Sequence, residues 1–125
     1  MIKVTLHPAE RKYYERFYGM ADAVYEIKNE DRTQIGLLFL SYYVDDSIFI
    51  EWIELISCFR YNGYLRYIFT ELHRIFPHKV IQLQCSEEKE YKFTGIGCRV
   101  VGYDECTELN ILEYDVNTMK RGILS

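Results

Sequence analysis

The chain has 125 residues, of which 49% are hydrophobic and 27% charged. This length suits one domain, and this balance excludes a disordered or fibrous protein. The net charge is −4, so no general attraction to a phosphate backbone exists, and we expect no nucleic-acid partner. The apolar runs are too short to cross a bilayer, so we also expect no membrane partner.

The N-terminal stretch Met1–Pro8 has neither the long apolar segment nor the small-residue cleavage site of a secretory signal. We therefore predict a cytoplasmic protein whose cysteines are reduced. The cysteines form no CxxC pair, and the histidines are scattered, so we predict no metal site. We expect each cysteine to be a small buried apolar residue: Cys58, Cys85, Cys98 and Cys106.

The N-terminal part of the chain predicts a strand followed by a helix. Apolar and polar residues alternate over Ile2–Leu6, which is typical of a short strand. Pro8 suits the first turn of a helix that continues to Tyr18 and stops at Gly19. This region therefore predicts β followed by α.

Three further strands are predicted next, joined by short polar turns. The run Gly36–Leu40 within the second of them is almost continuously apolar, as expected for a strand covered on both faces. We therefore expect an antiparallel meander with turns at residues 29–32 and 45–47. The predicted strands cover residues 22–28, 34–44 and 48–56.

The second half of the chain begins with the clearest helix of the sequence. From Gly63 the apolar residues recur at helical spacing, and the helix has to end before Pro77. A strand over residues 79–85, a short helix through Phe93 and strands over residues 99–103 and 109–116 follow. The order β α β β β α β α β β predicts an α+β fold in a single domain, residues 1–125.

The most informative stretch is a strand that runs through a turn into the N-terminus of that long helix. Unpaired backbone N–H groups and the positive end of the helix dipole favour a diphosphate at such a position. The turn, Arg60-Tyr-Asn-Gly-Tyr-Leu65, resembles the coenzyme A turn of the GCN5-related N-acetyltransferase (GNAT) family, whose form is Arg or Gln, x, x, Gly, x, Gly or Ala. Residues 79–85 are similar to its fifth strand, and residues 91–102 resemble its Tyr-x-x-x-Gly-Phe segment and the strand after it.

The resemblance covers about residues 22 to 116 and implies a mixed, mostly antiparallel sheet with helices on both faces, as in acyl-CoA N-acyltransferases. It implies that acetyl-CoA is the cofactor and that its acetyl group passes to an amine by direct attack. A backbone N–H near Leu55 or Ile56 would hold the carbonyl oxygen. The pyrophosphate would be held by the turn, that is by Arg60, Tyr61, Asn62, Gly63, Tyr64 and Leu65.

Two carboxylates beside this turn are candidates for the catalytic base. Strand alternation predicts that Glu51 and Glu54 point to opposite faces, and we choose Glu54 because it is nearer the strand end. Trp52, between them, is interpreted as a core or dimer-interface anchor. The general acid depends on the register chosen for the glycine segment: one register places Tyr91 there, and the other places Phe93, which has no proton to donate.

The sequence departs from the family pattern at Leu65, where the family has Gly or Ala. Its side chain either crowds the pyrophosphate or points into the core beneath the helix. The short N-terminal half also leaves open a protein acceptor, a site completed in a homodimer, or a non-catalytic domain of the same fold that binds another protein. A small α+β ligand-binding domain unrelated to coenzyme A is a third interpretation.

Overall fold

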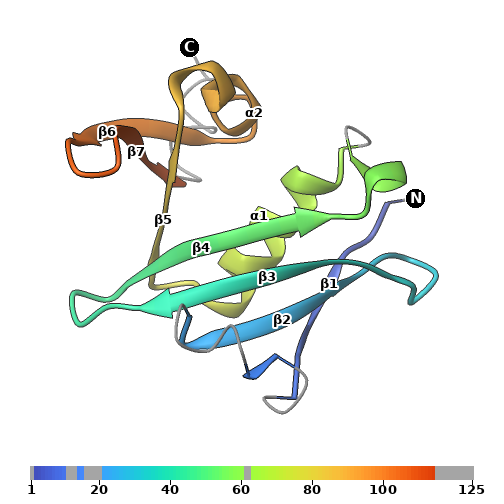
Figure 1. The fold of residues 1–125 in the computed structure, drawn as a ribbon. Coiled ribbons are helices and arrows are strands. Elements are labelled where there is room, and N and C mark those ends of the chain that lie inside the picture. Colours follow the sequence, from blue (N-terminus) through green and yellow to red (C-terminus); the bar gives the residue numbers. More distant parts are fainter. Residues whose placement is uncertain (1, 11–13, 16–20, 61–62, 115–125) are drawn as a thin grey trace. The chain divides into compact units, whose positions relative to one another are not determined.

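The computed structural model describes residues 2–10, 14–15, 21–60 and 63–114. The chain divides into two compact units, Met1–Lys79 and Val80–Ser125 (Figure 1), and each is described by itself. Together their described parts contain seven strands and two α-helices. Neither of these helices is long and apolar enough to cross a membrane.

The first unit contains four antiparallel strands in which each pairs with the next along the chain. The predicted meander is confirmed, and so is its first turn, where the Asn29 side chain accepts the N–H groups of Asp31 and Thr33, both at 3.0 Å. Along the third strand, Ile35, Leu38 and Leu40 are fully buried, as its apolar run predicts. The strands are β1 (Thr5–Pro8), β2 (Ala23–Lys28), β3 (Gln34–Tyr42) and β4 (Ser47–Leu55).

The N-terminal strand lies further along the chain than predicted, because it covers Thr5–Pro8 and not Ile2–Leu6. Pro8, placed at the start of a helix by the sequence, lies in β1 opposite Tyr25. The next N–H, that of Ala9, donates to Val24 O at 2.9 Å, so the pairing continues beyond the proline. The prediction was wrong at Pro8 because an edge strand tolerates a residue without an N–H as well as a helix start does. Residues 11–13 and 16–18 of the predicted helix lie outside the described residues.

The long helix is confirmed as α1 (Tyr64–Ile75), which passes behind the strands of the first unit in Figure 1. Its apolar side buries Ile68, Phe69 and Leu72 completely. At its start, the buried Tyr64 side chain donates its O–H to Glu30 Oε1 at 3.2 Å. This bond fixes the first turn of the helix to the β2–β3 hairpin.

The second unit is a three-stranded antiparallel arrangement in which β7 lies between β5 and β6. The predicted order strand, short helix, strand, strand is confirmed, so the α+β fold class is correct. Apolar side chains of all three strands are buried: Ile81, Leu83, Cys85, Cys98 and Leu112. The elements are β5 (Val80–Cys85), η4 (Glu87–Lys89), α2 (Glu90–Thr94), β6 (Cys98–Asp104) and β7 (Leu109–Tyr114).

The cysteines divide into two classes. Cys85 and Cys98 are buried, as predicted, and burial raises the pKa of Cys98 to about 12. Cys58 and Cys106 are exposed, so the prediction was wrong for them. Both lie in short connections between elements rather than on a strand, and such connections run over the protein surface.

Candidate active site

A β-bulge divides β4. Leu40 of β3 lies opposite Ile50, but its neighbour Phe39 lies opposite Trp52. Glu51 is therefore an extra residue that has no residue opposite it in β3. A bulge of this kind re-aims the side chains that follow it. The bulge therefore decides which side chains of β4 share a face.

The bulge places both candidate carboxylates on one face of the sheet. Trp52 and Glu54 lie opposite Phe39 and Leu37, so all four residues belong to the same face. Glu51 accepts the Ser41 O–H at 2.8 Å, and Ser41 lies two residues from Phe39 on that face. The prediction that the two glutamates point to opposite faces was wrong, because regular alternation does not hold across a bulge.

This face combines an apolar floor with a negatively charged surround. Ala21, Val24 and Phe39 form a buried cluster, and Leu37 packs against it. The ring of Tyr43 packs against that of Phe49, with 6.0 Å between the ring centroids, and the pKa of Tyr43 is raised by partial burial and then by the carboxylates of Glu51, Asp22 and Asp45. Such a surface suits a positively charged group carried on an apolar chain.

Trp52 is part of this face and not of the core. Its side chain is 53% exposed, and its indole N–H donates to Glu54 Oε2 at 3.3 Å. The sequence-based interpretation as a core residue was therefore wrong. The contact keeps the Glu54 carboxylate beside the indole ring.

At the end of β4, the Ile56 N–H points toward β3 and the backbone groups of Leu55 point away from it. The Ile56 N–H donates to Ile35 O at 2.7 Å, so this N–H is used within the sheet and is not available as a donor to a ligand. Hydrogen-bonded and non-hydrogen-bonded pairs alternate in an antiparallel ladder, so the backbone groups of Leu55, opposite Gly36, point away from β3. Of the two predicted donors, Leu55 remains the candidate.

Gly36 permits this approach of β3 to β4. A Cβ atom at this position would lie 2.0 Å from the Glu54 carbonyl oxygen, which no side chain tolerates. In the sequence, Gly36 was visible only as part of an apolar run. A glycine inside a strand is a known sign of close backbone approach, so the signal was present in the sequence.

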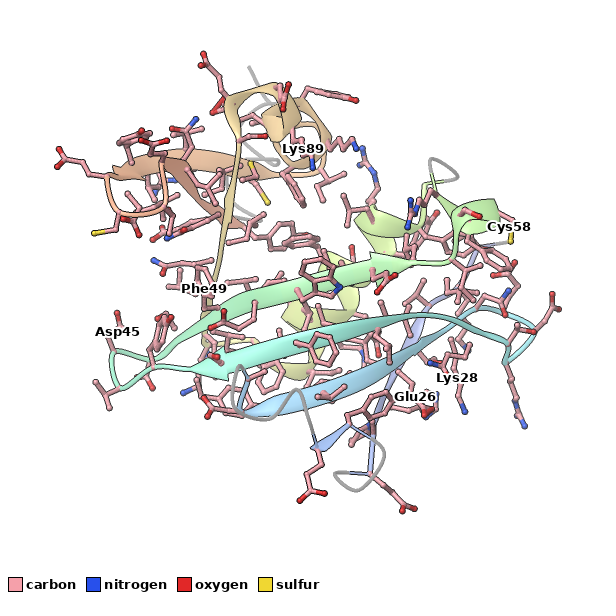
Figure 2. The ribbon with its side chains drawn as sticks, in the orientation of Figure 1. Glu26, Lys28, Asp45, Phe49, Cys58 and Lys89 are labelled. Carbon is pink, nitrogen blue, oxygen red and sulfur yellow. The ribbon has the colours of Figure 1, made fainter. Side chains whose placement is uncertain are left out.

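A short turn connects β4 to α1. It contains η3 (Ser57–Phe59), and Cys58 lies there, as Figure 2 shows. The Arg60 side chain folds back so that its Nε–H donates to Leu55 O at 2.9 Å. Arg60 thus holds the end of β4 against the turn. Tyr61 and Asn62, both predicted to bind the cofactor, lie outside the described residues.

The start of α1 suits an anionic group. Gly63 precedes the helix with φ of 84°, a conformation that favours glycine, and a Cβ there would meet no atom nearer than 3.8 Å. The N-cap residue, Gly63, has no side chain that could cap the first N–H groups, and the first turn carries no acidic residue. Leu65 is half-buried, so its side chain is partly withdrawn from the surface. These features fit a pyrophosphate.

The predicted general acid belongs to the second unit. Tyr91 lies on α2 and is 68% exposed, whereas the alternative residue, Phe93, is half-buried. An exposed phenol is free to meet a substrate, so the geometry of α2 is compatible with the register that selects Tyr91. Within the described residues, no group of three or more His, Cys, Asp or Glu side chains is arranged to hold a metal ion.

No family model and no curated protein sequence matches the chain. Solved structures do. A chimera of the spermidine N-acetyltransferase SpeG from Vibrio cholerae and hSSAT aligns with a TM-score of 0.70 at 13% identity, over 94% of this chain and 99% of that one. A GNAT family acetyltransferase from Elizabethkingia anophelis, with acetyl-CoA bound, gives 0.67 at 11% identity, over 91% and 99%. The IAA acetyltransferase from Bacillus cereus gives 0.64 at 10% identity, over 91% and 100%.

Proposed function

We propose that this chain, which has the fold of the GNAT acetyltransferases, transfers an acetyl group from acetyl-CoA to an amine. The observation that carries the proposal is the bulge in β4. It gathers Glu51, Trp52 and Glu54 on one face of the sheet and leaves the backbone of Leu55 directed away from β3. A carboxylate near an amine and a backbone donor for the acyl oxygen are two groups that this reaction requires.

Acetyl-CoA would supply the acetyl group as a thioester. The start of α1 would hold its pyrophosphate through the N–H groups from Tyr61 to Leu65, with Gly63 allowing close approach. Arg60 would position the end of β4 through its bond to Leu55 O. Leu55 N–H would stabilise negative charge on the carbonyl oxygen.

Glu54 is the proposed base. It would take a proton from the acceptor nitrogen, which then attacks the carbonyl carbon while the carbon–sulfur bond breaks. Tyr91, as the resemblance implies, would give a proton to the departing sulfur. The acidic surround of Tyr43 supports a cationic amine as acceptor, because negative side chains attract an ammonium group.

A thermal-shift titration tests cofactor binding. At one hundred times Kd, acetyl-CoA should raise the melting temperature of the chain by about 10 °C. Gly63→Glu should abolish the shift because it places a negative charge at the start of α1. Gly63→Ala is the matched control, since it introduces the same backbone strain without the charge and should retain most of the shift.

No shift at millimolar acetyl-CoA would contradict the proposal. Release of free coenzyme A with spermidine as the first acceptor then tests turnover, because one structural neighbour is a spermidine N-acetyltransferase. A cofactor-dependent shift without turnover on spermidine or on protein lysines would favour the alternative, a non-catalytic domain of this fold that binds another protein.

A further inference from the structure

Among the described residues, β1 is the first strand of the sheet order and pairs with β2 alone, so no described strand lies at its outer edge. The Ala9 N–H bonds to Val24 O, which identifies this pair as a hydrogen-bonded one. The pairs alternate along an antiparallel ladder, so His7 and Thr5 also point their backbone groups toward β2. The backbone N–H and C=O groups of Leu6 therefore point outward.

The same alternation continues beyond the strand. Lys3 N–H donates to the Glu30 carboxylate at 3.4 Å on the β2 side, so Val4 points its backbone groups outward as Leu6 does. Pro8, the next outward residue, has no N–H to offer. The open stretch thus spans Val4 and Leu6, with Lys3 and Pro8 on either side. Lysine and proline are residues that natural edges use against indiscriminate pairing.

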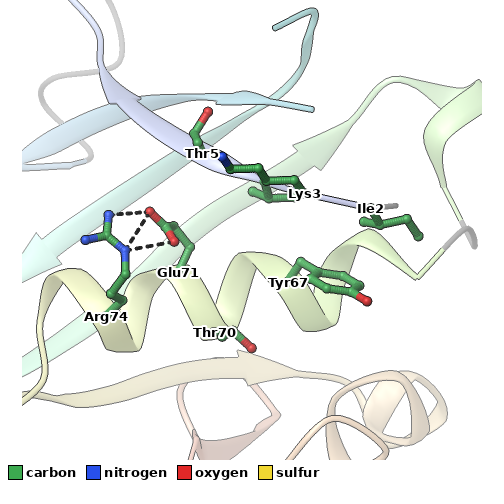
Figure 3. A pocket seen from close by; sticks show the side chains of 8 residues that line it. Ile2, Lys3, Thr5, Tyr67, Thr70, Glu71 and Arg74 are labelled. Carbon is green, nitrogen blue, oxygen red and sulfur yellow. Dashed lines mark hydrogen bonds and ion pairs between the residues drawn. The ribbon is translucent and has the colours of Figure 1, made fainter. Parts of the chain in front are cut away.

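A cleft of about 470 Å³ lies along this edge. One wall is the segment Ile2–Thr5, and the other is a stripe of α1 side chains at helical spacing (Figure 3). In Figure 3, Ile2 lies toward Tyr67, while Thr5 lies toward the other end of the stripe. The stripe consists of Tyr67, Thr70, Glu71 and Arg74.

The cleft is positively charged although the chain is negative overall. Lys3 and Arg74 contribute two positive charges and Glu71 one negative charge, so the lining carries +1 against −4 for the whole chain. Glu71 lies largely buried beside the guanidinium of Arg74, which is 69% exposed. Because Arg74 is ion-paired with Glu71, the net positive charge of the lining equals that of Lys3.

We propose that this cleft binds an extended peptide segment with acidic side chains, which adds to β1 as a further strand beside α1. Only an extended polypeptide presents alternating N–H and C=O groups that match those of Val4 and Leu6, and strand addition is an established mode of peptide recognition. Acidic side chains complement Lys3 and Arg74. A second copy of this chain would bring another positive cleft to the same edge, so it is the less suitable occupant.

Amide hydrogen exchange tests the proposal residue by residue. In the free protein the amides of Val4 and Leu6 should exchange fast, whereas those of Thr5 and His7 are protected by β2. The probe is the heptapeptide Thr-Val-X-Val-X-Val-Thr, acetylated and amidated, with X as Glu, Ser or Lys. At 1 mM, the Glu peptide should slow exchange at Val4 and Leu6 at least tenfold, the Ser peptide less, and the Lys peptide least. The same Glu peptide with alternate backbone nitrogens methylated should give no protection, because it cannot pair.

Two surface variants separate charge from fold. Arg74→Glu should weaken binding of the Glu peptide about tenfold or more and strengthen binding of the Lys peptide. Arg66→Glu, at an exposed position outside the cleft lining, should change neither affinity. No protection by any peptide would overturn the proposal. Protection present before a peptide is added would also overturn it, since the edge would then be covered by the chain itself or, if the protection grows with protein concentration, by a second copy. None of these outcomes depends on acetyl-CoA, so this proposal and the proposed activity fail independently.

Discussion

The two halves of β4 differ in what their side chains do. In the first half, Ile48 and Ile50 are 1% and 6% exposed and belong to the core. In the second half, Glu51, Trp52 and Glu54 are exposed, although they belong to the same strand. The boundary is the bulge at Glu51. One strand thus anchors a candidate site in a rigid core, and a single extra residue separates the two roles.

The difference shows why the site cannot be derived from burial alone. A regular strand would have sent every second residue after Ile50 toward the core, and Trp52 would have been buried with it. The bulge shifts the pattern by one, so that Ile53 and Leu55 continue the inner face while the polar residues stay outside. Substitutions in one half of β4 at a time test whether the two halves have these different roles.

The largest effect is expected on catalysis, from a substitution in the second half of β4. Glu54→Gln should lower kcat by about 10²- to 10⁴-fold, because it removes the proposed base. The free energy of unfolding should change by less than about 0.5 kcal/mol, since the side chain is exposed. Steady-state kinetics and urea denaturation measure the two quantities. Glu51→Gln is the matched control and should lose about tenfold or less; a larger loss for Glu51→Gln would transfer the role of base to Glu51.

The next largest effect is expected on the free energy of unfolding, from a substitution in the first half of β4. Ile48→Ala should lower the free energy of unfolding by about 2–5 kcal/mol, because it leaves a cavity in the core. Ile53→Ala, beyond the bulge and half-buried, should cost roughly half as much. Urea denaturation with an unchanged m-value provides the comparison. Equal losses of unfolding free energy at the two positions would show that the two halves of β4 contribute equally to the core.

The smallest effect concerns the bulge itself. Ser41→Ala removes the hydrogen bond to Glu51 at 2.8 Å and should destabilise the chain by about 0.5–1.5 kcal/mol. A double-mutant cycle with Glu51→Ala, which removes the acceptor, measures the coupling between the two side chains. Coupling close to zero would mean that the backbone register alone holds the bulge.

Several elements followed directly from the sequence. The spacing of Leu65, Ile68, Phe69 and Leu72 predicted α1, because one face of a helix has to bury its apolar side chains. Polar clusters at residues 29–32 and 45–47 predicted the hairpins. The N-terminal segment was harder, because Pro8 is compatible with a helix start and with the end of an edge strand. The cytoplasmic location, the single domain and a homodimer stay predictions.

The candidate site was predicted less completely. Arg60 and Gly63 were found from the resemblance of the turn to the family's coenzyme A turn. Both occupy special positions, one by its bond to Leu55 O and the other by its φ of 84°. The roles of Ser41 and Gly36 were missed. Each depends on a partner in β4 that lies at least ten residues away along the chain. A glycine within a strand indicates a close backbone approach, but it does not identify the partner.

The sequence by itself determined the order of the elements and the turn between β4 and α1, because helix periodicity, strand alternation and turn residues are local properties. The tertiary structure was needed to show that Glu51 and Glu54 share a face, that Ile56 N–H donates to Ile35 O and that the backbone groups of Val4 and Leu6 point away from β2. These facts follow from strand register. Register is set by pairing between distant segments, and a shift of one residue reverses every side chain and every backbone group beyond it.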